Sequence, residues 1–316
     1  MPEVTIIINC HNGDKYLSEC IDSVFGQTFN DWEIVFWDNK SSDKSASIAK
    51  KYGPKLRYFY GEKKLSLGHA RQLAMQEARG EYIAFLDTDD LWLEAHLEEQ
   101  VAFMENNEFL ASYAGIQEIN ADGVVIRDLF PHFSSGPMLC NILRQFEINV
   151  PTMMLHRSLI FEYGFFFNPS IFIVEEFELF VRIAVYHEIG VIHKVLAQYR
   201  VHEGGLTSRT PLLAAQERNV ILTSLIKNNP VTYAENQQDF LAAFARSAYY
   251  EARSHAENGN LPDARRVFKK YRFNNYIYFC IYISFWLPKT FWMNFNLDNL
   301  KRNPVLSWLV LRVFKK

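Results

Sequence analysis

The chain has 316 residues, of which 49% are hydrophobic and 15% aromatic, so it can bury a sizeable core and is unlike a disordered chain. Its net charge of −3 argues against nucleic acid as the main partner. The four cysteines show no spacing typical of metal or redox sites, and the first residues predict a strand rather than a signal peptide. These features predict a cytoplasmic protein with reduced thiols.

Strands alternate with helices over the first part of the chain. Short β-rich runs predict the strands, and apolar residues at helical spacing predict the helices between them. The predicted strands are residues 4–8, 33–37, 56–60 and 82–86, and the predicted helices are residues 14–25, 44–52 and 67–78. This alternation is typical of βαβ units, in which the strands form a parallel sheet.

Polar residues follow three of these strands, at residues 9–12, 38–43 and 87–90. The carboxyl ends of parallel strands meet at one edge of a sheet, where ligands bind, so we expect the three clusters to converge. Asp87, Asp89 and Asp90 lie close together in sequence, and a divalent cation with oxygen ligands would compensate their charges. Alternatively, Asp89 or Asp90 caps a helix that starts near residue 91.

The order of these motifs resembles that of the family 2 glycosyltransferases over residues 3 to about 210. The motifs are His-Asn after the first strand, Asp-Asn-Lys-Ser-Ser-Asp after the second, Leu-Gly-His-Ala-Arg-Gln, and Leu-Asp-Thr-Asp-Asp. The resemblance implies an α/β protein of the GT-A fold, a mostly parallel twisted sheet flanked by helices, that transfers a sugar from a nucleotide diphosphate with inversion. It implies a catalytic domain at residues 1–210, with a nucleotide-sugar half at about 1–95 and an acceptor half at about 96–210. A C-terminal helical extension follows at residues 211–316.

The resemblance places the donor's nucleobase beside the first two polar clusters. It puts Asn9, His11 and Asn12 at the base, with His11 in the place of an aromatic residue, although a lone histidine after a strand is more often a loop residue. Asp38 would accept the N3–H of uracil or thymine, which favours UDP or dTDP sugars, or else it forms a turn. The family has a glycine where this chain has Lys40, which leaves the path of the loop open.

The same resemblance assigns the diphosphate and the metal. Arg71 would reach the base edge or the diphosphate, or else pair with Glu77 or Asp87 as a surface arginine. Asp87 would lie near the ribose and the metal. Asp89 would ligate Mn²⁺ or Mg²⁺ that bridges the diphosphate and neutralises the leaving group. Asp90 would support this site or cap a helix.

The second half of the resemblance concerns the acceptor. Glu175 and Glu176 match a Glu-Asp pair of the family whose second member is the general base, so the base falls on Glu176, with Glu175 as the alternative. Both acids could instead favour a helix macrodipole. Arg200 and His202 lie in a segment that resembles the family's Tyr-Arg-x-His. His202 could approach the metal or the diphosphate, and Arg200 could cover phosphate or pair with a carboxylate.

Beyond residue 210 the sequence predicts helices at 210–229 and 236–258, and a helix near residue 263 that resembles one helix of a repeat unit. From residue 263 onward, eleven basic and two acidic residues give a net charge of +9. The apolar run at 276–287 is about 12 residues long, shorter than the roughly 20 that a spanning helix needs. Basic residues mixed with Trp, Tyr and Phe predict a peripheral contact with the inner face of the cell membrane. The alternative is a helical pair packed on the catalytic domain.

Three functions compete on this basis. The leading hypothesis is an inverting, metal-dependent glycosyltransferase that extends a glycan or lipid-linked acceptor in surface-polysaccharide synthesis. A sugar nucleotidyltransferase would share the sheet and the acids, but residues 9–13 supply neither a convincing Gly-rich phosphate loop nor an activating lysine. The third is a non-catalytic relative that binds a nucleotide sugar or a glycan, motivated by the departures at residues 39, 40 and 176.

Overall fold

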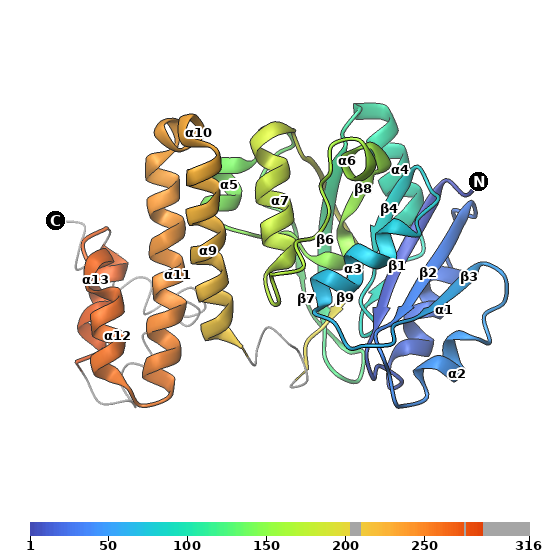
Figure 1. The fold of residues 1–316 in the computed structure, drawn as a ribbon, viewed down its shortest axis with the longest axis horizontal. Helices are drawn as coiled ribbons and strands as arrows, with labels where there is room; N and C mark the ends of the chain where they lie inside the picture. The colour runs from blue at the N-terminus through green and yellow to red at the C-terminus, as the bar shows by residue number, and fades with distance from the viewer. Residues whose placement is uncertain (203–209, 275, 287–316) are drawn as a thin grey trace. The chain divides into compact units, whose positions relative to one another are not determined.

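The computed structural model of the protein describes residues 1–202, 210–274 and 276–286. The chain divides into two compact units, Met1–Leu206 and Thr207–Lys316, which are treated separately below. The first unit carries all the strands found in the described residues, and the second is helical in its described part (Figure 1).

The first unit is built on one sheet of nine strands, in the order β3-β2-β1-β4-β8-β6-β9-β5, with β7 paired to β6. The strands are β1 (Val4–Cys10), β2 (Trp32–Asp38), β3 (Leu56–Tyr60), β4 (Tyr82–Phe85), β5 (Leu91–Trp92), β6 (Ala111–Ile119), β7 (Val125–Leu129), β8 (Met154–His156) and β9 (Gly190–Arg200). Every residue of β1 is buried, as expected for a central strand covered on both faces. The four strands predicted from the sequence are confirmed.

Helices flank the sheet. They are α1 (Leu17–Phe25), α2 (Ser45–Ala49), α3 (Leu67–Gln76), α4 (His96–Asn107), α5 (Leu139–Arg144), α6 (Arg157–Phe161) and α7 (Glu175–Tyr186), with a 3-10 turn at Val150–Thr152. α1 begins three residues later than predicted, because the backbone N–H groups of the loop before it donate hydrogen bonds to side chains that follow β2. Gly13 N donates to Ser45 Oγ at 3.1 Å, and Asp14 N donates to Asp43 Oδ2 at 2.9 Å.

The sheet is mixed rather than mostly parallel. β1, β2, β3 and β4 pair in parallel, as the βαβ pattern predicts. β8 then pairs antiparallel with both β4 and β6, β7 and β5 are antiparallel to their partners, and only β6 and β9 restore a parallel pair. The regular alternation of strand and helix ends after β4, so the sequence pattern carries no information on these later pairings.

The prediction of a helix starting near residue 91 is wrong. Residues Leu91–Trp92 form β5, which pairs antiparallel with β9, and the next helix starts at His96. Trp92 is 4% exposed, and its indole N–H donates to Pro151 O at 2.6 Å. Burial of this side chain in the sheet's core outweighs the local preference of an acidic cluster for a helix N-terminus.

The second unit contains α9 (Pro211–Asn228), α10 (Pro230–Glu235), α11 (Gln237–Glu257), α12 (Leu261–Phe268), a 3-10 turn (Lys269–Tyr271) and α13 (Tyr276–Ser284). The helices predicted at 210–229, at 236–258 and near residue 263 are confirmed as α9, α11 and α12. α11, α12 and α13 share a small core in which Phe268, Ile281 and Phe285 are buried. The start of the basic and aromatic tail therefore packs within its own unit.

Some tail residues nevertheless lie open. Phe273 is 71% exposed and Trp286 is 63% exposed. Among the described helices, none is both long and apolar enough to cross a membrane. The remainder of the tail, including Trp292 and Trp308, lies outside the described residues.

Candidate active site

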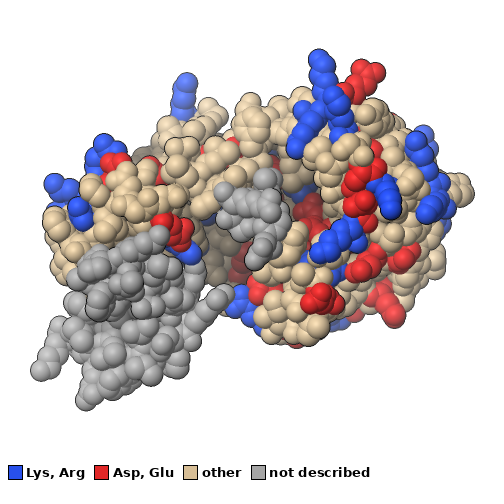
Figure 2. All heavy atoms as spheres, turned by 90° about the horizontal axis from the view of Figure 1, so that it is seen from below, with Lys and Arg blue, Asp and Glu red and all other residues tan. Residues whose placement is uncertain are grey.

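β1, β2 and β4 end at one edge of the sheet and bring the three polar clusters together. Cys10 lies opposite Asp38, and Ile7 lies opposite Phe85. Asn39 N donates to Cys10 O at 2.7 Å, so the strand pairing continues into the loops. On the face of the first unit that Figure 2 shows, Asp and Glu side chains lie among Lys and Arg side chains.

The three aspartates after β4 differ in their surroundings. The side chains of Asp87 and Asp89 are 29% and 34% exposed, whereas Asp90 is buried. Asp90 Oδ1 accepts the backbone N–H of Arg200 at 2.8 Å, and Oδ2 is a buried oxygen without a hydrogen bond. Burial, together with the charges of Asp89 and Asp87, raises the pKa of Asp90 well above its usual value. Asp90 is thus a buried acid beside the site, and its predicted role as a helix cap is wrong.

Asp89 and His202 meet although they are far apart in the chain. His202 Nε2 lies 2.8 Å from Asp89 Oδ2, and the His202 ring packs edge-on against Tyr16. No group of three His, Cys, Asp or Glu that could hold a metal occurs within the described residues. A carboxylate and an imidazole do fit a cation that takes its remaining ligands from phosphate and water, as Mg²⁺ and Mn²⁺ do.

Arg71 joins two parts of the site. Its side chain, on α3, is 2% exposed and forms ion pairs of 2.5 Å with Asp87 Oδ1 and with Glu175 Oε1. Glu175 is the first residue of α7 and lies 104 positions further along the chain. The guanidinium fixes the loop after β4 to the start of α7, because its planar fork holds two carboxylates at once. Arg71 therefore pairs with Asp87 as one alternative foresaw, but as a buried residue.

The two glutamates at the start of α7 are not equivalent. Glu175 is 2% exposed, and its Oε2 is buried without a hydrogen bond, whereas Glu176 is half-buried. Burial raises the pKa of the Glu175 carboxyl, against the lowering effect of Arg71, and the charge of Glu176 adds to the rise. Gly68 on α3 packs closely against the start of α7, since a Cβ there would lie 3.2 Å from the Glu175 Cβ. Glu175 is held inside the protein, which leaves Glu176 as the more accessible acid.

Asn9, His11 and Asn12 follow β1 in three different environments. Asn9 is 8% exposed, and neither polar atom of its side chain has a hydrogen-bond partner. His11 is exposed, with Nδ1 3.0 Å from Asn39 O. Asn12 Oδ1 accepts the N–H of Ser42 at 2.8 Å. The loop after β1 is therefore bound to the loop after β2, and Asn9 retains unused polar atoms at the strand end.

Asp38 is fully buried at the end of β2. Its Oδ1 accepts the N–H of Ser41 at 2.7 Å, and its Oδ2 accepts the hydroxyl of Tyr58 at 2.6 Å. The first contact is that of the turn-forming alternative. Burial, with the Asp38 carboxylate as its hydrogen-bond acceptor, raises the pKa of Tyr58. Contact between Asp38 and a nucleobase remains a prediction, and Tyr58 is a neighbour that sequence reasoning missed.

The loop after β2 keeps a left-handed turn without a glycine. Lys40 has φ of 63°, a conformation that costs a residue with a Cβ about 1 kcal/mol or more. Asn39 holds the turn in place. Its Nδ2 donates to Leu65 O, and its Oδ1 accepts the Leu65 N–H, both at 2.9 Å. The substitution of the family's glycine is therefore accommodated by backbone strain at an exposed lysine.

Arg200 supports the acidic loop from behind. Its side chain is 1% exposed, its Nε donates to Asp89 O at 2.9 Å, and one terminal nitrogen pairs with Glu19 at 2.8 Å. The guanidinium also lies over the Tyr16 ring, 4.3 Å from its centroid. These contacts agree with the carboxylate-pairing alternative, and we do not assign Arg200 to the proposed donor contacts. Neither Glu19 nor Tyr16 carries a local sequence signal for this role.

Comparisons with known proteins agree with this architecture. Residues 5–163 match the family model described as Glycosyl transferase family 2. The chain is 34% identical over 231 residues to an uncharacterized glycosyltransferase of Rickettsia felis, covering 72% of this chain but 38% of that relative. It is 27% identical over 208 residues to WfgD of Escherichia coli, named as a UDP-Glc:alpha-D-GlcNAc-diphosphoundecaprenol beta-1,3-glucosyltransferase, covering 65% of this chain and 79% of WfgD.

Two solved structures share the fold at low sequence identity. S. aureus TarS 1-349 in complex with UDP-GlcNAc superimposes with a TM-score of 0.62 at 18% identity, covering 87% of this chain and 93% of that one. The mannosyltransferase PcManGT from Pyrobaculum calidifontis, in complex with GDP-Man and Mn²⁺, has a TM-score of 0.57 at 17% identity, covering 96% of this chain and 88% of that one. At this level of identity the likeness concerns the fold.

Proposed function

The chain belongs to glycosyl transferase family 2 and has the GT-A fold, and from this premise we propose that it transfers a sugar from a nucleotide diphosphate to a hydroxyl group of a glycan or lipid-linked acceptor. The observation that carries the proposal is the buried link from Asp87 through Arg71 to Glu175. It holds the acidic loop and the start of α7 at one edge of the sheet. Transfer needs metal ligands at the diphosphate and a general base at the acceptor. The acidic loop would carry the first and the start of α7 the second, and the link would hold both in a fixed relative position.

We propose UDP or dTDP sugars as donors. The resemblance carries this proposal at Asp38, whose two carboxylate oxygens can each accept a further hydrogen bond besides those from Ser41 and Tyr58 once the loops over this fully buried side chain admit the base. Asn9 supports it with a buried amide that lacks a partner at the adjacent strand end. The name of WfgD includes UDP-Glc, and TarS is described in complex with UDP-GlcNAc, which agrees with a uracil base.

We further propose that Asp89 and His202 would hold Mn²⁺ or Mg²⁺ together with the donor diphosphate, with Asp87 beside them. The cation would supply charge neutralisation of the leaving diphosphate. The remaining contributions come from the chain itself. Arg200 fixes the backbone of Asp89 through its carbonyl oxygen, and Arg71 fixes the Asp87 side chain. The acidic loop is thereby held in place before any ligand arrives.

Glu176 is the proposed general base. The acceptor hydroxyl is a weak nucleophile until its proton leaves, and the Glu176 carboxylate would take that proton as the oxygen attacks the anomeric carbon. Attack opposite the leaving diphosphate inverts the anomeric configuration. Glu175 is unsuited to this task in the structure because it is 2% exposed and paired with Arg71. Glu176 has one methylene group more than the family's Asp. In this proposal, the half-buried position of the side chain keeps the longer carboxylate oriented toward the acceptor.

A panel of nucleotide sugars tests this function. With Mn²⁺ or Mg²⁺ and a range of glycan and lipid-linked acceptors, we expect release of nucleoside diphosphate and a glycosylated product. Release of pyrophosphate from a nucleoside triphosphate and a sugar phosphate would support the nucleotidyltransferase alternative instead. Donor binding without turnover on any acceptor would support the non-catalytic alternative.

We also propose a peripheral contact with the cytoplasmic face of a membrane. The net charge of +9 from residue 263 onward carries this proposal, and exposed Phe273 and Trp286 support it. The packing of α13 against α11 and α12 limits the proposal to exposed side chains and to residues outside the described part of the chain.

A further inference from the structure

α13 exposes apolar side chains on one face, while its other face packs into the core of the second unit. Tyr278, Ile281 and Phe285 lie on the packed face. Ile283 and Trp286 are 45% and 63% exposed, whereas a surface helix normally turns polar side chains to water. The nine residues of α13 include no charged side chain. The exposed face of this helix is therefore apolar.

The apolar surface extends from the end of α13 back to the turn before it. Phe279 and Ile283 are four positions apart, and Trp286 N donates to Ile283 O at 3.0 Å, so the three side chains share one side of the helix. Phe273 is 71% exposed, and its ring stacks on that of Phe279 with the centroids 5.9 Å apart. We call Phe273, Phe279, Ile283 and Trp286 the α13 ridge. Exposed apolar side chains that are gathered in this way, rather than scattered singly, mark a contact surface.

An arginine lies over an exposed aromatic ring at each end of the α13 ridge. The guanidinium carbon of Arg272 lies 4.3 Å from the centroid of the Phe273 ring, and that of Arg265 lies 4.3 Å from the Trp286 ring. Arg265 also donates to Phe285 O at 2.8 Å, which fixes α12 to the end of α13. Such a pair suits a bilayer interface, because the ring can enter the apolar layer while the guanidinium stays among the headgroups.

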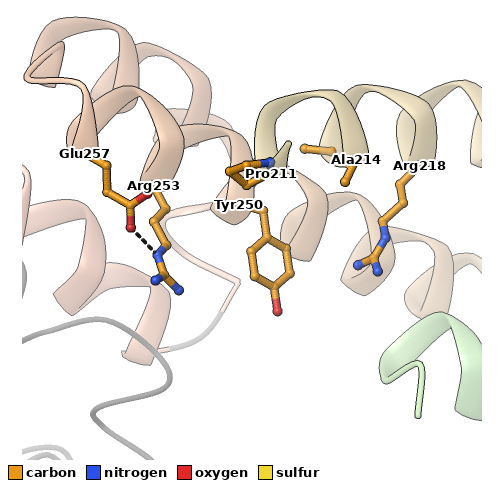
Figure 3. Close-up of a pocket in the computed structure, with 7 residues that line it drawn as sticks. Pro211, Ala214, Arg218, Tyr250, Arg253 and Glu257 are labelled. Atoms are coloured by element: carbon orange, nitrogen blue, oxygen red, sulfur yellow. Dashed lines mark hydrogen bonds and ion pairs between the residues drawn. The ribbon is translucent and has the colours of Figure 1, made fainter. Parts of the chain in front are cut away.

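Positive charge in the described part of the second unit is concentrated next to the α13 ridge. Residues 261–286 contain five basic residues and one acidic residue, whereas residues 211–260 contain four basic and five acidic residues. In that earlier stretch Arg253 pairs with Glu257, and both line the cavity between α9 and α11 together with Tyr250 (Figure 3). Attraction to an anionic surface therefore comes from the segment that contains α12 and leads into α13.

We propose that the α13 ridge is the membrane-binding surface of the second unit and that it selects a bilayer with anionic headgroups. α13 would lie in the plane of the interface, with the ridge side chains below the headgroups and Arg265 and Arg272 among them. The helix is already packed on α11 and α12, so binding would not require it to fold. This inference rests on the peripheral membrane contact proposed above, to which it adds the surface, the orientation and the lipid class.

Co-sedimentation of the full chain with vesicles tests the proposal. We expect vesicles of phosphatidylcholine with phosphatidylglycerol to bind the chain at least about tenfold more tightly than phosphatidylcholine alone, with a difference that shrinks in salt. Trp286→Ser should weaken binding to the anionic vesicles by about tenfold, and Ile283→Ser and Phe273→Ser by about fivefold each, because each removes apolar surface from the bilayer. Arg272→Gln should weaken it by about fivefold through loss of one charge at the headgroups. Equal binding to the two kinds of vesicle would overturn the selection of anionic lipid.

Two variants on other helices serve as matched controls. Val231→Ser removes an aliphatic side chain that is 70% exposed on α10, and Lys227→Gln removes a positive charge from the last turn of α9. Each should change vesicle binding by less than about twofold. A loss in Val231→Ser as large as that in Ile283→Ser would refute the assignment to the α13 ridge. If a helix variant unfolds by circular dichroism, Phe273→Ser carries the test, because Phe273 precedes α13.

The depth of Trp286 tests the orientation. Lipids with brominated acyl chains quench tryptophan fluorescence only where the indole reaches the apolar layer. We expect these lipids to quench the native chain more than Trp286→Phe, which keeps an aromatic side chain and should bind vesicles within about threefold of the native chain. Equal quenching of the two proteins at equal binding would contradict insertion of the α13 ridge.

The outcomes separate this inference from the membrane contact on which it rests. If the native chain does not sediment with anionic vesicles, the membrane contact itself is wrong. If it sediments and the ridge variants sediment equally well, the contact lies elsewhere in the chain and only the α13 ridge is refuted. Analytical ultracentrifugation without vesicles should give the same mass for the native chain and Trp286→Ser. A native dimer that dissociates in this variant would show that a second copy of the chain covers the α13 ridge instead.

Discussion

Removal of the guanidinium at Arg71 should weaken both stability and transfer. In Arg71→Met, the Glu175 carboxyl, 2% exposed, would lose its ion-pair partner, and such a loss at a buried pair costs about 3–5 kcal/mol. Asp87 is 29% exposed, so water would solvate its carboxylate in the variant, and loss of its ion pair would add little to the change in the free energy of unfolding. Because burial already raises the pKa of Glu175, its carboxylate would take up a proton in the variant, and the neutral acid would lose less stability than an unpaired buried charge. We therefore expect a loss of about 3 kcal/mol in the free energy of unfolding.

Urea unfolding of a matched set of variants tests this value. Arg71→Met/Glu175→Gln removes the uncompensated charge together with its partner, so it should recover most of the lost stability while transfer stays impaired. Arg127→Met is the control, because its pair with Glu118 is a surface pair with side chains 45% and 17% exposed and should cost less than about 1 kcal/mol. If Arg71→Met is as stable as the native protein, or if the second substitution restores no stability, the link from Asp87 through Arg71 to Glu175 does not stabilise the fold.

Three further outcomes are expected. Glu176→Gln should lower transfer by about 100-fold or more while donor affinity survives, and a native rate for this variant with a loss in Glu175→Gln would move the base by one residue. UDP or dTDP should bind more tightly than GDP because Asp38 accepts N3–H, and calorimetry showing the reverse order would count against that contact. A chain ending after Trp286 keeps the core of α13 and should sediment less with anionic vesicles than the full chain, with a difference that shrinks in salt. Equal partitioning would leave the missing segment without a membrane role.

The edge of the sheet that carries the candidate site could be predicted from the sequence, because its strands are encoded by short local patterns. Each of the first four strands is a short apolar or β-rich run, and three of them end in polar residues, so the parallel topology alone brings residues 9–12, 38–43 and 87–90 together. The second half of the sheet has no such regular spacing. β8 and β9 enter it through contacts set by tertiary packing, which short-range periodicity does not encode.

Roles that depend on distant partners could not be predicted. Arg71 meets Glu175 across 104 positions, and Asp89 meets His202 across 113. The motif left open whether Arg200 covers phosphate or pairs with a carboxylate, and the structure has it donating to Asp89 O and pairing with Glu19. A residue type and its neighbours fix what a side chain can bind, whereas burial decides which partner it takes. The resemblance implies Asp89 and His202 separately as metal ligands, and the structure adds the contact between them at 2.8 Å.

The dependence of sugar transfer on Asp89 tests the central claim most directly. Release of nucleoside diphosphate should be measured with the native protein in Mn²⁺, with the native protein in EDTA, and with Asp89→Asn in Mn²⁺. The account predicts turnover in the first case, none in the second, and a loss of about 100-fold or more in the third, because the charge of the diphosphate would go uncompensated. Full activity in EDTA or in Asp89→Asn, with the variant still folded, would contradict the placement of the active site at this edge of the sheet.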